Sequence, residues 1–582
     1  MKRLFTLTLI LALPAFFIAN AEDDKAAQRK ARRKAAEAAT TGNTTSDSLV
    51  LVKTGLSLPS LFGNHMILQQ NMKNTIWGWA NAKEQITVTA SWGASASTQA
   101  DADGGWKVLL DTPAFGTGHS LKIAGTKTIE ISDVAIGEVW LCAGQSNMGW
   151  STGNSAEAEL EANVNLPNYR IFKSAREHWH EPLKEKRDLL GQWKPCNPES
   201  AAETSVVAYN FGKKLHLALN VPIGIIQEAY AGTPIEGWMP WEVQQDMAQS
   251  KEQKADMDRS AKRQLDGKGE SREKSLATFQ SELADYNAKV AAGETMKNRA
   301  RALQPPSITK PADLGNQYPA NIFNGMIYPI RPYGIKGAIW YQGESNQRRA
   351  FQYQELLPTM INDWRKQWME PFSFYIVQLA NFGNGKPVTT EPGIPDTWAE
   401  LQEAQTLTAQ TLDKCGIAII NDIGEQNDIH PKNKQEVGRR LALWALAKDY
   451  GKASAEFCGP LYLSSVLKED KIRVQFTHTG AGLKTRDGGE PKCFQITGAD
   501  QKWVWAKAKI EGSEVIVWSE SVPKPIGVRY AWASWPVDAN LINAEGLPAS
   551  CFRTDDFLPS TLGVVSPFKE AATPAKPAPA KP

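Results

Sequence analysis

The sequence predicts an α/β protein with a mostly parallel sheet, preceded and followed along the chain by β domains. Three apolar stretches, residues 138–148, 335–346 and 419–431, each end abruptly in glycine and polar residues. Segments with apolar residues at helical spacing separate them, which is typical of βαβ units. Because the carboxyl ends of parallel strands lie along one edge of a sheet, we expect the three polar endings to meet in one crevice.

The first of these stretches brings a serine to a turn. Val139, Trp140 and Leu141 suit a buried strand, Gly144 permits a sharp bend, and Ser146 then stands where a helix would begin. This arrangement can present a nucleophile. The structural alternative is an ordinary strand-to-helix turn in which Ser146 caps the helix.

Length and composition limit the classes of function. The chain has 582 residues, too many for one core, so three or four domains are expected. A formal net charge of +2 and the lack of any nucleic-acid-binding motif argue against a nucleic-acid partner. The twenty tryptophans are unusual; most should lie in the core, although indole faces also stack on sugar rings.

The N-terminus has the features of a secretory signal peptide. Met1-Lys-Arg3 precedes an apolar run from Leu4 to Ile18, and small residues follow up to Ala21. This run is short for a membrane anchor, and no second stretch could span a bilayer. We therefore expect cleavage after Ala21 and a periplasmic or secreted protein. That location permits disulfides, but spacing does not indicate how the six cysteines would pair.

Composition and periodicity divide the chain into six segments. These are a signal peptide (1–21), a disordered leader (22–47), an N-terminal β-sandwich domain (48–135), the α/β domain (136–457), a C-terminal β domain (458–560) and a Pro/Ala-rich tail (561–582). Residues 242–303, rich in Lys, Glu, Gln and Ala, are expected to form a helical hairpin inserted outside the sheet, or to be partly disordered.

Strands and helices can be placed within these domains. The strands expected outside the one that leads to Ser146 are 76–79, 86–90, 106–110, 121–123, 221–226, 335–341, 372–379, 416–420, 472–476, 504–506, 515–518 and 527–530. Helices are expected over 207–218 and 353–368, with a kink at Pro358. A further helix should begin at Pro431, because proline suits the first helical position.

The polar endings contain the parts needed for ester hydrolysis. A serine esterase requires a nucleophile, a base and hydrogen-bond donors for the oxyanion, and Ser146, His430 and the glycine- and amide-rich turns can supply them. Gly144-Gln-Ser-Asn-Met148 lacks the second glycine of G-x-S-x-G, which argues against the α/β-hydrolase fold.

Four motifs resemble those of bacterial sialate O-acetylesterases, which are SGNH hydrolases. They are Gly144-Gln-Ser-Asn-Met148, Gly232-Thr-Pro-Ile-Glu-Gly-Trp238, Trp340-Tyr-Gln-Gly-Glu-Ser-Asn346 and Asp428-Ile-His-Pro-Lys-Asn-Lys434. The resemblance extends from about Leu58 to Asp556. It implies a flavodoxin-like α/β domain between β domains, hydrolysis of acetyl esters on sugars, and no cofactor.

The resemblance also implies roles for individual residues. Ser146 would be the nucleophile, and His430 the general base and later the acid. The N–H groups of Ser146 and Gly232 would bind the oxyanion. For the third donor, this subfamily departs from the plain Gly-x-Asn motif of the superfamily. The Gln342 amide is preferred, since it leaves the strand first, with Asn346 as the second choice.

The acid that orients His430 departs from the superfamily pattern. There the aspartate usually lies three residues before the histidine, where this chain has Asn427. Asp428 is preferred, although a carboxylate only two residues away needs a bent backbone to reach the imidazole. Asp422, or a backbone carbonyl in a Ser–His dyad, remains an alternative.

Other acids and histidines have structural interpretations. Glu236 and Glu344 are better explained as acids that brace turns than as a glycosidase pair. The group formed by Asp422, Glu425, Asp428 and His430 resembles a metal site, but the serine mechanism uses the histidine and needs no cation, so no metal is expected. Structural or surface roles are expected for the remaining histidines: His65, His119, His178, His180, His216 and His478.

Three functions therefore remain open. The protein is an acetylesterase acting on O-acetylated sialic acids, an acetylesterase acting on a polysaccharide such as acetylated xylan, or a carbohydrate-binding surface protein with an inactive hydrolase scaffold. Intact Ser146 and His430 argue against the third. The partner expected is an acetylated sugar or glycan, and the sequence does not indicate an oligomeric state.

Overall fold

The structure is a computed structural model that describes residues 55–155, 159, 161–178, 189–259, 315–383, 391–452 and 456–565. Several predictions lie outside these residues: the signal peptide 1–21, the leader 22–47, the insertion beyond residue 259 and the tail beyond residue 565. No helix among the described residues is long and apolar enough to cross a membrane. The six cysteines are free thiols.

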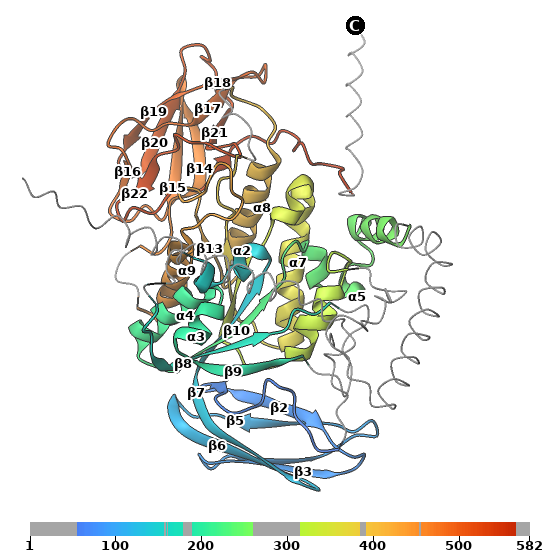
Figure 1. The fold of residues 1–582 in the computed structure, drawn as a ribbon. Coiled ribbons are helices and arrows are strands. Elements are labelled where there is room, and N and C mark those ends of the chain that lie inside the picture. The colour runs from blue at the N-terminus through green and yellow to red at the C-terminus, as the bar shows by residue number, and fades with distance from the viewer. Residues whose placement is uncertain are drawn as a thin grey trace, which may run out of the picture. The chain divides into compact units, whose positions relative to one another are not determined.

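The centre of the structure is a mixed sheet with six parallel strands and one antiparallel edge strand (Figure 1). Its order is β13 (Cys415–Ala418), β12 (Ser373–Val377), β11 (Gly337–Tyr341), β7 (Thr128–Gly144), β10 (Ile223–Ala229), β8 (Leu166–Ser174) and β9 (Gly191–Cys196). The five strands expected in this region are confirmed, and they pair in parallel register. This arrangement places β7 between β11 and β10, so the turn after it lies at the middle of the sheet edge.

Two strands of this sheet, β8 and β9, were not predicted from the sequence. β8 carries Arg170 and Lys173 and β9 carries Lys194, so neither shows the apolar run of the other strands. Arg170 is buried because its guanidinium donates to the backbone carbonyl and carboxylate of Asp133. A buried cation that is paired in this way is compatible with a strand.

Helices cover the sheet in two pairs (Figure 1). α4 (Val206–Leu219) packs against α9 (Lys434–Lys448), and α7 (Ala350–Trp368) packs against α8 (Thr397–Thr411). α4 and α7 are confirmed, with Pro358 inside α7, whereas α8 was not predicted. α9 begins at Lys434 and not at Pro431, because the Asn433 side chain caps it by accepting the Glu436 N–H.

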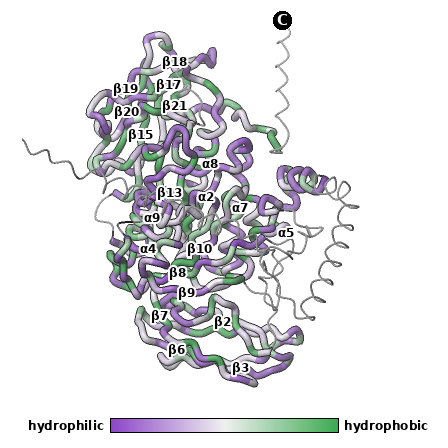
Figure 2. Tube along the Cα trace, viewed as in Figure 1, coloured by the Kyte–Doolittle hydropathy of each residue, from purple (hydrophilic) through white to green (hydrophobic). Residues whose placement is uncertain are grey.

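Tryptophans fill the core between sheet and helices, as expected for most of them. Trp140 of β7 packs on Phe211 of α4, with ring centroids 5.0 Å apart, and Trp340 of β11 packs on Trp364 of α7 at 5.8 Å. All four side chains are fully buried. Figure 2 shows that hydrophobic residues concentrate along the strands and that the turns between them are mostly hydrophilic.

The N-terminal β region shares a strand with the central sheet. β2 (Lys73–Trp79) pairs with β5 (Gly105–Asp111), and β3 (Gln85–Ala90) pairs with β4 (Ser95–Gln99) and β6 (Gly116–Ala124). β6 and β1 (Ile67–Gln69) both pair with the first half of β7. The strands expected here are confirmed, but the boundary proposed at residues 135 and 136 falls inside β7, which continues without a break from Thr128 to Gly144.

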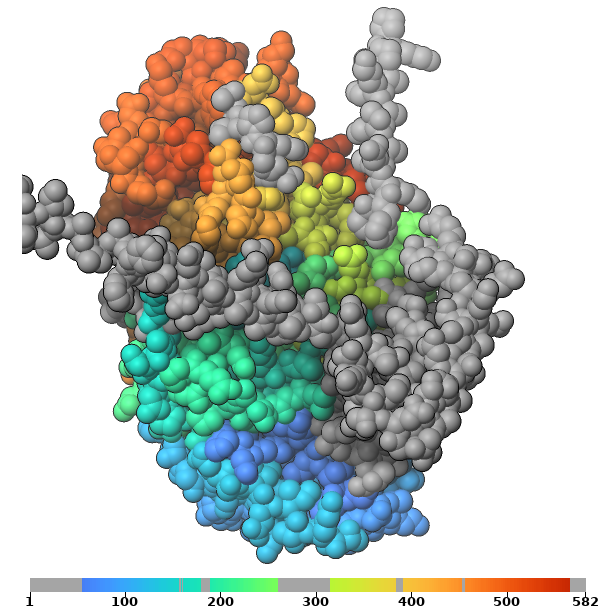
Figure 3. Space-filling view, viewed as in Figure 1, coloured from blue at the N-terminus to red at the C-terminus, as the bar shows by residue number. Residues whose placement is uncertain are grey.

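The C-terminal region is built of β strands around a second hydrophobic core, and it forms a continuous orange to red surface in Figure 3. One sheet has the order β14 (Leu461–Lys468), β15 (Lys471–Thr477), β20 (Glu514–Trp518) and β19 (Lys507–Glu511). A second has the order β18 (Trp503–Trp505), β17 (Phe494–Thr497), β21 (Gly527–Tyr530) and β23 (Phe552–Arg553). β16 (Leu483–Thr485) pairs with β22 (Leu541–Asn543). The four strands expected here are confirmed as β15, β18, β20 and β21.

The first part of the predicted insertion belongs to the folded body. After α5 (Trp241–Gln244), residues 248–259 are helical. The buried Gln244 amide donates to the backbone carbonyls of Glu236 and Met239, and Tyr318 donates to Asp258 at 2.9 Å. Residues 242–259 therefore contain helix and no strand, and they pack against the α/β domain.

Candidate active site

Ser146 lies where β7 meets α2 (Ser146–Gly149), at the expected strand-to-helix turn. Gly144 ends the strand with a φ of 149°, and a Cβ at this position would collide with the backbone oxygen of Tyr341 on β11. Glycine is therefore required for the close approach of the two strand ends. The serine emerges from this turn half-buried, between strand ends that are themselves buried.

His430 reaches the same point from a loop after β13. Its Nε2 lies 2.9 Å from Ser146 Oγ, although 284 residues separate the two in the sequence. Trp150 stacks on the imidazole, with ring centroids 5.3 Å apart and an interplanar angle of 28°. The expected convergence of the first and third polar endings is thus observed, with the imidazole held between the hydroxyl and an indole.

The Asp428 carboxylate lies beside His430. Its Oδ1 accepts the backbone N–H of His430 at 2.8 Å and lies 3.7 Å from the imidazole Nδ1. The first contact supplies the backbone bend that was expected, but the second is longer than a hydrogen bond. Burial lowers the pKa of His430, as does the charge of Lys434, while the charge of Asp428 opposes them.

The other candidates for the orienting acid are held elsewhere. Asp422 forms a two-point ion pair with Arg440 at 2.6 and 2.9 Å. Glu425 accepts the backbone N–H of Lys432 at 2.8 Å, and Asn427 is exposed. Asp428 is therefore the acid of this loop that is placed to act on His430.

Gly232 and Asn346 come together at the turn after β10. Gly232 has a φ of 71° and is half-buried, and its N–H makes no hydrogen bond with the described part of the chain. Nearby, the buried Asn346 side chain accepts the Ile235 N–H at 2.9 Å and donates to Glu236 at 2.9 Å. The second polar ending therefore lies against the glycine turn.

The Gln342 side chain makes all of its hydrogen bonds in the protein interior. Its side chain is fully buried, and Nε2 donates both hydrogens, to the Thr233 carbonyl at 3.1 Å and to Asn346 Oδ1 at 2.8 Å. Its Oε1 accepts the Tyr353 hydroxyl at 2.7 Å. The preference for Gln342 over Asn346 as an oxyanion donor does not fit this arrangement, because no hydrogen of the Gln342 amide is left for a substrate.

Glu236 and Glu344 brace turns, as expected. The buried Glu236 carboxylate pairs with Arg349 and accepts from Asn346. Glu344 accepts a hydrogen bond from Asn147, the residue after the serine, and burial raises the pKa of its carboxyl. Glu344 therefore links the first and second polar endings, and Glu236 links the turn after β10 to the second.

Lys434 has a place at the site that was not predicted. Its ammonium is buried and donates to Asn147 Oδ1 at 2.5 Å, while Asn147 Nδ2 donates to the carbonyl of Ile429 at 3.0 Å. Burial lowers the pKa of Lys434 to about 8, against the opposing charge of Glu344. Its position in the sequence could have indicated this role, because Lys434 lies four residues after His430 and is the first residue of the helix that follows.

Other groups around the site show no metal-binding cluster. Within the described residue ranges, no three His, Cys, Asp or Glu side chains are grouped so that they could hold a metal ion. The acids named as an alternative metal set instead pair with Arg440, Lys432 and the loop backbone.

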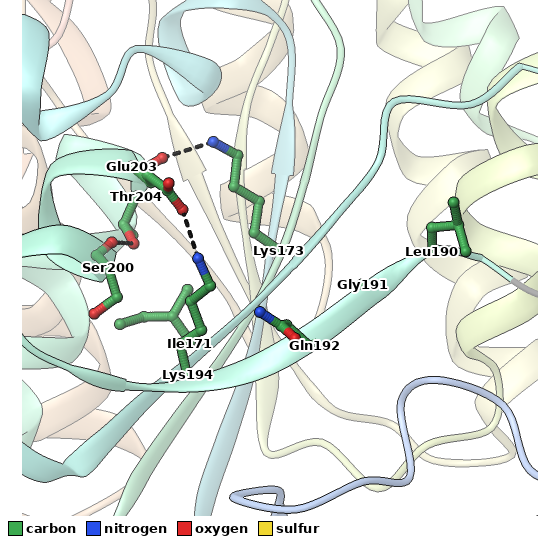
Figure 4. Close-up of a pocket in the computed structure, with 9 residues that line it drawn as sticks. All are labelled: Ile171, Lys173, Leu190, Gly191, Gln192, Lys194, Ser200, Glu203 and Thr204. Carbon is green, nitrogen blue, oxygen red and sulfur yellow. Dashed lines mark hydrogen bonds and ion pairs between the residues drawn. The ribbon is translucent and has the colours of Figure 1, made fainter. Parts of the chain in front are cut away.

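A cavity of about 400 Å³ lies elsewhere, between β8, β9 and α3 (Pro198–Glu203) (Figure 4). Lys173 and Lys194 point towards Glu203, donating to its carbonyl and its carboxylate at 2.7 and 3.0 Å. Neither Ser146 nor His430 lines this cavity. The cavity is therefore distinct from the candidate active site.

Comparison with known proteins places this site in a family. Residues 136–290 match the family model described as "Carbohydrate esterase, sialic acid-specific acetylesterase". The crystal structure of a novel carbohydrate acetylesterase from Xanthomonas citri superposes with a TM-score of 0.70 at 33% identity, covering 86% of this chain and 100% of that one.

Curated relatives agree with the structural match. The sialate O-acetylesterase of Homo sapiens is 26% identical over 529 residues, covering 83% of this chain and 89% of the relative. That of Rattus norvegicus is 25% identical over 523 residues, covering 83% and 91%. Together the fold, the site and these matches define a carboxylic ester hydrolase. The chain belongs to the carbohydrate acetylesterase family, whose sialic acid-specific model it matches.

Proposed function

We propose that this protein is a serine esterase that removes O-acetyl groups from sugars, with O-acetylated sialic acids as the first candidate substrate. The observation that carries the proposal is the 2.9 Å contact between Ser146 Oγ and His430 Nε2 at the centre of the sheet edge. The curated sialate O-acetylesterases, which align over most of their length, support the choice of substrate. The strand order also favours the flavodoxin-like SGNH arrangement.

The proposed reaction begins with proton transfer from Ser146 to His430. The Ser146 oxygen attacks the acetyl carbonyl carbon, and the negative charge develops on the carbonyl oxygen. The backbone N–H groups of Ser146 and Gly232 would bind this oxyanion. We assign the third donor to Asn346, because its Oδ1 is fixed by Ile235 and its Nδ2 has one hydrogen not used by Glu236.

Collapse of the tetrahedral intermediate releases the sugar. His430 gives its proton to the departing sugar oxygen, which leaves as an alcohol and leaves an acetyl group on Ser146. His430 then takes a proton from water as the water oxygen attacks the acetyl-enzyme, and it returns that proton to Ser146 Oγ as the acyl bond breaks and acetate leaves. Asp428, 3.7 Å from Nδ1, would stabilise the imidazolium that forms in each half-reaction.

Acetylated polysaccharide is the second candidate substrate. The structural relative from Xanthomonas citri is described only as a carbohydrate acetylesterase, and it is more similar in sequence than the curated relatives. We also propose that the protein is exported to the periplasm or secreted, on the basis of its N-terminal sequence.

Hydrolysis of 4-nitrophenyl acetate by the purified protein tests the esterase assignment, and Ser146→Ala is its control. We expect a loss on the order of 10⁴-fold, since the hydroxyl is the nucleophile. Retention of most activity by a pure variant would exclude Ser146. Acetate release from O-acetylated sialic acid and from acetylated xylan, measured side by side, then decides between the two substrates.

A further inference from the structure

The imidazole ring of His430 makes one hydrogen bond. Its Nε2 lies 2.9 Å from Ser146 Oγ, whereas the Asp428 carboxylate, 3.7 Å from Nδ1, is too distant for a hydrogen bond. Nδ1 makes no hydrogen bond within the described part of the chain. A single hydrogen bond does not fix the plane of an imidazole, because the ring can still tilt about its Cβ–Cγ bond. The plane of the ring must therefore be held by a contact of another kind.

Trp150 supplies that contact. Its indole stacks on the His430 imidazole, with ring centroids 5.3 Å apart and an interplanar angle of 28°. Offset stacking at this separation is a favourable arrangement of two aromatic rings. An imidazole that tilted out of this plane would lose the stacking contact or collide with the indole. The indole thus restrains the movement that the hydrogen bond to Ser146 leaves open.

The backbone around Trp150 is itself fixed. The Trp150 carbonyl accepts the N–H of Val206, the first residue of α4, at 2.8 Å, and its Nε1 donates to the Asn154 carbonyl at 3.3 Å. α2 begins at Ser146 and is followed directly by Trp150. One short segment, tied to the start of α4, therefore places both the hydroxyl and the ring that stacks on the imidazole.

The indole face also suits the charge that forms during the reaction. When His430 takes the Ser146 proton, the imidazole becomes a cation, and the face of an aromatic ring attracts a cation. Trp150 is partly buried, so this attraction acts where less water is present to weaken it. The same contact can therefore hold the neutral ring and stabilise its protonated form.

We propose that Trp150 is a positioning residue that fixes the imidazole of His430 for proton transfer. In a serine triad, a carboxylate bonded to the imidazole has this orienting part. Asp428 contributes its charge and the bend of the backbone, and the indole contributes the orientation of the ring. The role rests on the proposed esterase function, in which His430 takes the proton of Ser146.

Trp150→Leu and Trp150→Phe test this role with 4-nitrophenyl acetate as substrate. Leucine has no flat face, so we expect Trp150→Leu to lower kcat about tenfold while KM stays within about twofold of wild type. Phenylalanine keeps an aromatic face and should restore kcat to within about threefold of wild type. An unchanged kcat in Trp150→Leu, an equal loss in both variants, or a change in KM alone would overturn the proposal.

Trp92→Leu is the matched control. Trp92 also packs on a histidine, His119, with ring centroids 5.4 Å apart, but this pair lies in the N-terminal β region. We expect its kcat and KM to match wild type, because neither ring belongs to the site. A loss of kcat in Trp92→Leu as large as in Trp150→Leu would attribute the effect to general destabilisation and would also overturn the proposal.

Reaction with a fluorophosphonate separates failure of this role from failure of the acetylesterase assignment. Ser146 Oγ attacks phosphorus, fluoride leaves, and His430 takes the hydroxyl proton, so the rate depends on a positioned base whatever ester is the natural substrate. Mass spectrometry measures the rate of labelling. We expect labelling to slow about tenfold in Trp150→Leu and to recover in Trp150→Phe. Equal rates in the two variants would refute the role of Trp150, even if acetyl esters prove to be the substrate.

Discussion

Asp422 and Arg440 form a buried two-point ion pair, with Nη1 to Oδ1 at 2.6 Å and Nη2 to Oδ2 at 2.9 Å. Arg440 also donates to the Ile419 carbonyl, so the pair fastens helix α9 to the end of β13. A carboxylate held in this way cannot orient His430. This leaves Asp428 as the acid whose charge acts on the imidazole.

Asp428→Asn should lower kcat for aryl acetate by about 10- to 100-fold with little change in KM. The expected loss is below the roughly 10⁴-fold seen when a directly bonded aspartate is removed, because Oδ1 and Nδ1 are 3.7 Å apart. The asparagine oxygen can still accept the His430 N–H, so the loop should keep its shape. Glu425→Gln, in the same loop, is the control. An Asp428→Asn variant within about threefold of wild type would favour a Ser–His dyad.

Asp422→Asn should affect stability and not chemistry. Removing Asp422 leaves the buried Arg440 without part of its countercharge. This should lower the free energy of unfolding by on the order of 3 kcal/mol. We expect a lower midpoint of urea unfolding and a kcat per folded molecule close to wild type. A normal midpoint with a low kcat would instead assign the orienting role to Asp422.

Lys434→Met should move the acidic limb of the pH–rate profile to higher pH. The Lys434 ammonium disfavours protonation of His430, so its removal raises the imidazole pKa and the base is lost at higher pH. Asp428→Asn should move the same limb in the opposite direction, since the aspartate charge raises that pKa. The measurement is kcat/KM for aryl acetate as a function of pH.

The control for Lys434 is Lys432→Met, which removes the same charge from an exposed position two residues away. Its profile should match wild type. If both lysine variants shift the limb equally, the effect comes from net charge and not from the buried ammonium.

Asn346→Ala should lower kcat by about 10²- to 10³-fold, the usual cost of losing an oxyanion donor. Gln342→Ala should mainly lower stability, because it removes the buried brace between Thr233, Tyr353 and Asn346. Stopped-flow turnover and thermal denaturation of the two proteins measure these effects separately. If Gln342→Ala loses more turnover per folded molecule than Asn346→Ala, the assignment of the third donor must be reversed.

Replacing residues 260–314 with a short Gly/Ser linker should leave a folded protein that still hydrolyses aryl acetate. The flanking residues lie close together, since Tyr318 donates to Asp258 at 2.9 Å, so a short linker can join them. A deletion that begins at residue 242 should instead give unstable protein, because it removes Gln244 from its contacts with Glu236 and Met239. Equal stability of the two deletions, by thermal denaturation, would contradict this view.

The sequence predicted the elements whose patterns are local. The apolar runs that became β7, β10, β11, β12 and β13 were recognisable, as was the turn that presents Ser146. β8 was missed because Arg170 interrupts its apolar pattern, and the Asp133 contacts that allow its burial come from a distant part of the chain. Charged residues in a strand cannot be recognised as paired without that partner.

The same reason explains which features of the site the sequence could not show. Gln342 was the preferred donor because it leaves the strand first, and only its contacts with Thr233 and Tyr353 show that its side chain faces inward. Lysine is usually exposed at the surface, yet Lys434 is buried between Asn147 and the ring of Tyr341. Such choices depend on contacts between residues far apart in the chain.

The continuity of β7 has a consequence for how the protein can be cut and recombined. One uninterrupted strand pairs at its start with β6 and β1 and at its end with β10 and β11, and its last residue is two positions before Ser146. Removing the N-terminal β region would sever that strand and expose the severed end of the central sheet to pairing with other chains. The N-terminal region is therefore not an exchangeable module: a fusion junction or a protease site placed between residues 128 and 144 interrupts the backbone that holds the proposed nucleophile.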